Sequence, residues 1–106
     1  MVEMEKGGTN VYEDLGMPDA GQMFVKAQLA AKIGEIIRQR GFTQQQAAQL
    51  INMPQPKLSG MLRGQFRGIS EAKMLACLND LGSNVDIIIS KPGSDYSRGD
   101  TRVTFA

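Results

Sequence analysis

The sequence predicts a mainly α fold, a bundle of about four to five helices followed by a C-terminal β-strand or hairpin. Two observations carry this expectation. Between residues 19 and 82, apolar residues recur every three or four positions, which is the period of helices that bury one face. After Gly82 the pattern changes to "VDIIISKP", a β-branched run of strand length, and the final "TRVTFA" alternates in polarity.

By composition the chain divides into three parts. Residues 1–18 mix charges of both signs with Gly-Gly and a proline, which predicts a mobile N-terminal arm. Residues 19–82 carry the helical periodicity. Residues 83–106 form the predicted β segment, a candidate dimerisation element, because a two-stranded ribbon is marginal unless it packs on the helices or on a second copy.

Capping residues and glycines locate the expected helix ends. Asp19, Thr43 and Ser70 are good N-caps for helices over about 19–40, 43–51 and 70–82, and a further short helix is expected within "QPKLSGMLRG". The helix that begins at Thr43 is expected to bury Leu50 together with its neighbours Ala47 and Ile51. Glycines that favour left-handed backbone follow three of these helices: Gly41, Gly64 and Gly82.

Charge points to a polyanionic partner for the middle of the chain. The net charge of the 106 residues is only +1, but residues 1–20 carry one lysine against five acidic residues, a net −4. Residues 21–67 carry seven lysines and arginines against one glutamate, a net +6. A basic middle segment is compatible with a nucleic-acid surface.

The residue inventory argues against several classes of protein. The chain has no histidine and a single cysteine, so neither a zinc site nor a Cys-His nucleophile is expected, and no intrachain disulfide can form. No carboxylate pair is singled out by spacing. We therefore expect no enzyme, no metal and no cofactor. No signal segment or apolar run of membrane-spanning length is evident, which favours a cytoplasmic protein.

Two short helices on either side of "NMP" have the spacing of a helix-turn-helix, in which the second helix enters the major groove of DNA. Ala48 is small where the two helices should cross closely. Asn52 lies in the turn, where left-handed backbone is expected and Asn is tolerated better than most residues. Leu58 and Met61 have the spacing to hold the second helix on the core.

At these residues the sequence resembles a known family. The run "TQQQAAQLINMPQPKLSGMLRG" resembles the lambda-repressor-like (Xre) helix-turn-helix proteins, and "NVYEDLGMPDAGQMFVKAQLAAKI" and "FRGIS" around it resemble the HigA-type antitoxin branch, over about residues 10–91. The sequence departs from the family at Asn52, where Gly is usual. It departs again at Gly60, which leaves no side chain at a base-facing position.

The resemblance implies a lambda-repressor-like bundle in residues 19–82 and a function. The expected protein is a homodimer that binds double-stranded DNA, represses its own operon and, as an antitoxin, neutralises a RelE/HigB-like messenger-RNA-cleaving toxin. Two alternatives stay open. One is a stand-alone Xre-type regulator without a toxin, and the other is mainly a toxin-sequestering interaction module.

Site residues follow from the same resemblance. Gln44 matches a phosphate-contacting glutamine, and Gln55 matches the glutamine at the start of the recognition helix, which can pair bidentately with adenine. Lys57 and Arg63 are assigned mainly to phosphates and Ser59 to base edges. The prolines at 54 and 56 are interpreted as starting this helix, because backbone N–H groups there lack intrahelical partners.

Other residues have competing interpretations. Arg67 is either a phosphate clamp or a loop charge, and Arg63 can also act as a partner of the helix dipole. Cys77 fits a buried apolar position. A solvated surface is the simpler interpretation for Gln45, Gln46 and Gln49, and a core or dimer strand for Ile87, Ile88 and Ile89.

Overall fold

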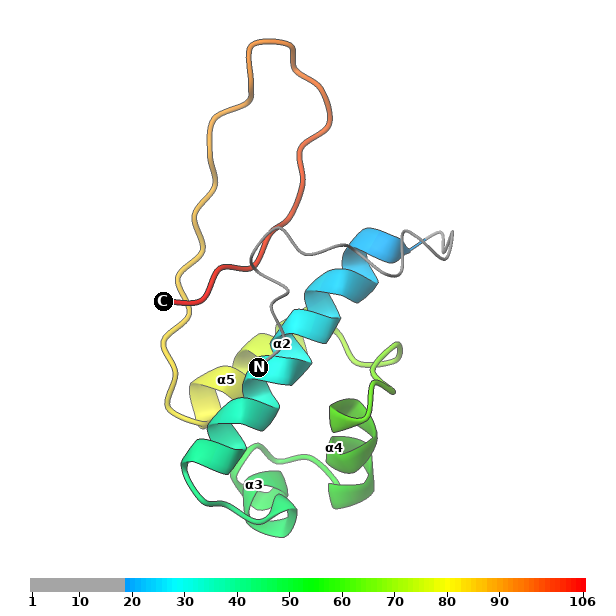
Figure 1. The fold of residues 1–106 in the computed structure, drawn as a ribbon, viewed down its shortest axis with the longest axis vertical. Coiled ribbons are helices and arrows are strands. Elements are labelled where there is room, and N and C mark those ends of the chain that lie inside the picture. Colours follow the sequence, from blue (N-terminus) through cyan, green and yellow to red (C-terminus); the bar gives the residue numbers. More distant parts are fainter. Residues whose placement is uncertain (1–18) are drawn as a thin grey trace.

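The computed structural model describes residues 19–106 and contains four helices in that range (Figure 1). They are α2 (Ala20–Gln39), α3 (Gln44–Leu50), α4 (Gln55–Leu62) and α5 (Glu71–Asp80). The predicted arm over residues 1–18 lies outside the described residues. The long α2 runs through the bundle and packs against α4 and α5, while α3 packs against α4 at one end. Over residues 19–106, no helix has both the length and the apolarity that a membrane span requires.

The core is one apolar cluster to which all four helices contribute. Leu58 and Met61 of α4 are fully buried, which confirms that they hold this helix on the bundle. Cys77 is also fully buried, as predicted, and burial raises the pKa of its thiol although nearby Lys73 lowers it. The other large side chains with at most 2% exposure are Ile33, Ile51, Met74 and Leu81.

Most helix ends are where the capping residues predict them. Thr43 accepts a hydrogen bond from the backbone N–H of Gln46, and the Gln46 side chain accepts one from the Thr43 N–H, which together form a capping box. Ser70 accepts a hydrogen bond from the Lys73 N–H at 3.0 Å and so caps α5. Left-handed backbone follows three helices, at Gly41, Gly64 and Gly82.

Two expectations about local roles are wrong. Asp19 occupies the N-cap position of α2, but its side chain makes no capping hydrogen bond and forms an ion pair with Arg67 instead. Leu50 was expected in the core and is 45% exposed. Its neighbours Ala47 and Ile51 are fully buried in the core cluster, which Leu50 does not join.

Three cations donate to main-chain carbonyls, two of which lie at the C-terminal ends of helices. The buried Lys26 Nζ donates to the carbonyl of Arg67 at 2.9 Å. Arg40 Nη1 donates to the carbonyl of Leu81 at the end of α5 at 2.8 Å, and Lys73 Nζ reaches the carbonyl of Ile51 at the end of α3 at 3.3 Å. Cations are favourable at the negative ends of helices, so these contacts stabilise the loops that join the helices.

The predicted C-terminal β-strand is absent from residues 83–106. The chain leaves the bundle after α5, turns far from the helices and returns along a separate path (Figure 1). A strand requires a neighbouring strand with which to form a ladder of backbone hydrogen bonds. The one backbone hydrogen bond within residues 83–106 closes a turn, from the Tyr96 N–H to the carbonyl of Gly93. Val85 and Val103 pack on the core, whereas the side chains of residues 87–89 are 74–89% exposed, so the interpretation of the isoleucines as core is wrong.

The turn between α3 and α4 requires a left-handed residue, as predicted. Asn52 has φ of 55°, and the following Met53 N–H returns to the carbonyl of Ala48 at 2.9 Å. Left-handed backbone costs a residue with a Cβ roughly 1–2 kcal/mol, and a short polar side chain reduces that cost. The turn therefore depends on the residue type at position 52.

We expect Asn52→Ala to lower the free energy of unfolding by about 1 kcal/mol, and Asn52→Gly to leave it within about 0.5 kcal/mol, because glycine carries no Cβ. Urea unfolding followed by circular dichroism measures both. An alanine variant as stable as the wild type would show that the turn relaxes out of the left-handed region.

Candidate nucleic-acid interface

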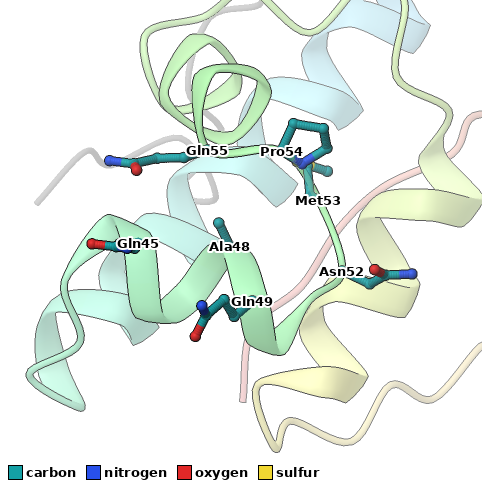
Figure 2. Close-up of a pocket in the computed structure, with 7 residues that line it drawn as sticks. All are labelled: Gln45, Ala48, Gln49, Asn52, Met53, Pro54 and Gln55. Carbon is teal, nitrogen blue, oxygen red and sulfur yellow. The ribbon is translucent and has the colours of Figure 1, made fainter.

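An open hollow of about 350 Å³ lies between α3 and the start of α4 (Figure 2). Gln45 and Gln49 of α3 line this hollow, together with Gln55 at the start of α4. Ala48 points across the hollow toward α4 and is 5% exposed, so a small residue is needed where the helices meet. The hollow is thus bordered by amides that can donate and accept hydrogen bonds.

The two prolines start α4, as predicted. Pro54 is the N-cap residue with φ of −57°, Gln55 is the first helical residue and Pro56 the second. The carbonyl of Pro54 accepts the N–H groups of Lys57 and Leu58, each at 3.0 Å. A proline in the first turn removes a donor that has no intrahelical partner, so the cost is small and the entry to the helix is stiffened. Gln55 is therefore exposed on a rigid helix start.

Helical spacing separates an inward and an outward face of α4. Leu58 and Met61 point into the core, and Ser59, Gly60 and Arg63 follow Pro56 at three, four and seven positions, on the opposite face. Arg63 Nη1 donates to Ser59 Oγ at 2.5 Å, which joins two predicted contact residues into one polar unit. This outward face is the surface of α4 that is available to a partner.

The structure brings most of the predicted contact residues together on α4. Gln55, Lys57 and Arg63 are exposed and Ser59 is half-buried. Gln44 is the exposed first residue of α3, the helix that packs on α4. Arg67 is the exception, because it lies in the loop after α4 and pairs with Asp19 at the start of α2.

Several basic side chains are already bound within the protein, so fewer of them are available to contact an anion. Lys32 forms an ion pair with Glu35 at 2.9 Å, and Arg67 forms one with Asp19. Lys26 and Arg40 are bound to carbonyls. Within the described residues, three cations of the basic middle segment form neither an ion pair nor a hydrogen bond to a main-chain carbonyl: Arg38, Lys57 and Arg63. Two of these three belong to or directly follow α4, so the unpaired positive charge of this segment concentrates on α4.

Two glutamines have roles that the sequence analysis did not assign. Gln46 completes the capping box of α3, and the Thr-x-x-Gln spacing is the signal that predicts it. Gln65 lies over Gly60 on the outward face of α4, with Oε1 3.0 Å from the point where a Cβ on Gly60 would stand. The signal for Gln65 is the left-handed glycine before it, since the residue after such a glycine returns toward the last turn of the helix.

Comparison with known proteins agrees with this geometry. Residues 11–90 match a family described as a helix-turn-helix domain. No curated protein matches the chain. A solved structure named as an XRE-family transcriptional regulator superposes with a TM-score of 0.75 at 28% identity, covering 84% of this chain and all of its own. Since the family match spans most of the 106 residues and the structure has the two helices and the turn, the chain belongs to the helix-turn-helix domain family.

Proposed function

We propose that the protein is a transcriptional regulator that represses genes by binding a specific sequence of duplex DNA through α4. The observation that carries this proposal is the position of Gln55, exposed between Pro54 and Pro56 at the first turn of the second helix. The first residues of that helix contact base edges in helix-turn-helix complexes. Similarity to the XRE-family regulator supports the same function.

Replacing Gln55 tests the proposal. A glutamine that pairs bidentately with adenine contributes ~1–3 kcal/mol of discrimination against the wrong base. We therefore expect Gln55→Ala to reduce discrimination at one base pair of the operator by roughly 5- to 150-fold. Binding of the wild type and the variant to single-base-pair variants of the preferred duplex measures this loss.

Gln39→Ala is the matched control, because Gln39 is an exposed glutamine on a different helix. It should leave both affinity and base preference unchanged. A Gln55→Ala protein that keeps the wild-type preference at every position would contradict the role of Gln55. Absence of sequence-dependent binding by the wild type would contradict the proposed function itself.

The proposal includes a homodimer formed through residues 83–106. Successive side chains of an extended chain point to opposite faces, yet Ile87, Ile88 and Ile89 are all exposed, at 74%, 87% and 89%. A cluster of exposed apolar side chains on an unpaired extended segment is typical of an interaction site. A second copy is the occupant we favour, because helix-turn-helix proteins commonly bind two half-sites as dimers.

Sedimentation of Ile88→Asp tests the dimer. The substitution should give a monomer of unchanged helix content, since the side chain makes little contact within its own chain. Ser94→Asp, an exposed position in the same segment, should remain dimeric. A wild-type protein that is monomeric at every concentration tested would contradict this part of the proposal.

A second candidate function is binding and neutralisation of a RelE/HigB-like toxin, which would make the protein an antitoxin that controls its own operon. The observation that favours it is the net charge of −4 over residues 1–20, opposite in sign to the basic middle segment. An acidic segment is suited to a basic protein partner. DNA and toxin would then use different parts of one chain.

Co-expression with the product of a neighbouring open reading frame tests the antitoxin function. We expect a small basic toxin to copurify with the chain and its inhibition of growth to be relieved. A variant with Glu3, Glu5, Glu13 and Asp14 replaced by their amides should bind the toxin more weakly and DNA as well as the wild type does. Failure of the wild type to form a complex or to relieve toxicity would eliminate this function.

A further inference from the structure

Gly60 contributes no side chain to the outward face of α4, yet its backbone is buried. The residue lies on the face of Ser59 and Arg63, opposite the core residues Leu58 and Met61, and has no side chain of its own. A Cβ at this position would lie 3.0 Å from Oε1, 3.7 Å from Cβ and 4.0 Å from Cδ of Gln65. The side chain of Gln65 therefore covers Gly60.

Backbone geometry at the end of α4 holds Gln65 there. Gly64 has φ of 96°, its N–H bonds the carbonyl of Met61 at 3.1 Å, and the Gln65 N–H bonds the carbonyl of Gly60 at 2.8 Å. This pair of bonds is a Schellman motif, which returns the second residue after the helix to the third residue before its end. A hydrophobic contact often accompanies the motif, but here an amide lies over a glycine.

The Gln65 carboxamide is free to bind a partner. Gln65 is exposed, and its side-chain amide makes no hydrogen bond with any residue in 19–106. The cap of α4 uses only the main chain of Gln65, so the side chain is not required to end the helix. It adds two donors and an acceptor to the face that otherwise offers Ser59 and Arg63.

We propose that Gln65 is a second specificity-determining residue, whose carboxamide occupies the place on α4 that Gly60 leaves empty and hydrogen-bonds a base edge. The inference rests on the proposed binding of DNA by α4. Gln55 and Gly60 are five residues apart, which is roughly 7.5 Å along a helix axis. That separation exceeds the ~3.4 Å rise of one base pair, so we expect the two amides to contact different base pairs. The two amides thus read positions a short distance apart in one half-site.

Selection from a randomised duplex library tests this inference on the full-length wild type, Gln65→Ala and Gly60→Ala. Gln65→Ala removes the amide, and the expected result is a loss of roughly 5- to 150-fold in discrimination at one base pair other than that read by Gln55. Gly60→Ala keeps the glutamine but moves its amide away, because the flexible end of the side chain yields to the new Cβ. It should lose discrimination at that same base pair.

The double variant and thermal unfolding complete the test. Gly60→Ala combined with Gln65→Ala should be no less discriminating than Gln65→Ala alone. The two single variants and the double variant should all unfold cooperatively with intact helices. Unchanged base preference in Gln65→Ala, alongside a sequence-specific wild type, overturns this inference and leaves the proposed function in place. A wild type that selects no sequence overturns both.

Discussion

Leu58→Ala is expected to lower the free energy of unfolding by about 2–5 kcal/mol, the usual cost of truncating a fully buried leucine. Leu58 has no exposed area and joins α4 to the core cluster. Small domains are stable by only ~5–15 kcal/mol, so the loss is a large fraction of the total. Operator binding should fall as well, because the cavity loosens the helix that carries Gln55. Denaturant unfolding and binding assays measure the two effects.

Lys57→Ala is the matched control, one residue away and exposed. It should leave the free energy of unfolding within about 0.5 kcal/mol and weaken DNA binding alone. If Leu58→Ala proved as stable as Lys57→Ala, the packing of α4 described here would be wrong.

Raising monovalent salt from 50 to 200 mM should weaken operator binding by about 10³-fold, which is the loss typical of some six phosphate contacts. Lys57, Arg63 and Arg67 in each of two protomers would supply that number. Counterions condensed on DNA are released when cations replace them, and added salt opposes the release. Fluorescence anisotropy with a labelled operator gives the slope of log affinity against log salt.

Variants separate these contacts. Arg63→Ala should reduce the slope by about one for each phosphate contact it removes and weaken all sequences nearly equally. Lys91→Gln, an exposed cation in the C-terminal segment, should leave the slope unchanged. A shallow slope in the wild type would mean that the cations of α4 do not contact phosphates.

Within residues 19–106, Arg67 is the one of these three cations that forms an ion pair in the free protein. Its charge faces a carboxylate in the free protein, because Asp19 pairs with it across the gap between α2 and the loop after α4. A phosphate contact by Arg67 requires that pair to open. The pair is only partly exposed, with the Arg67 side chain 57% and the Asp19 side chain 30% exposed, so its opening costs on the order of 1 kcal/mol.

Several features of the fold could be predicted from the sequence because their causes are local. The caps at Thr43 and Ser70, the left-handed residue at Asn52 and the proline start of α4 all depend on residues within a few positions of one another. Steric and hydrogen-bonding preferences of short segments decide such features. The candidate contacts on α4 were implied by the resemblance to the lambda-repressor-like proteins, and helical spacing adds that Ser59 and Arg63 lie on the face of α4 away from the core.

Tertiary structure decided the features that depend on distant neighbours. Leu50 is exposed because no helix covers its side of α3, and Asp19 binds Arg67, a residue 48 positions away, in place of capping its own helix. The isoleucines of residues 87–89 have strand character, but a strand forms only where another segment offers a ladder of hydrogen bonds.

The sequence by itself thus determined where most helices begin and end and which face of α4 points away from the core. Local backbone preferences and helical periodicity depend only on neighbouring residues. Only the folded arrangement decided which side chains are covered, which cations are engaged and that Gln65 returns over Gly60. These outcomes are contacts between segments, and periodicity along the chain does not specify them.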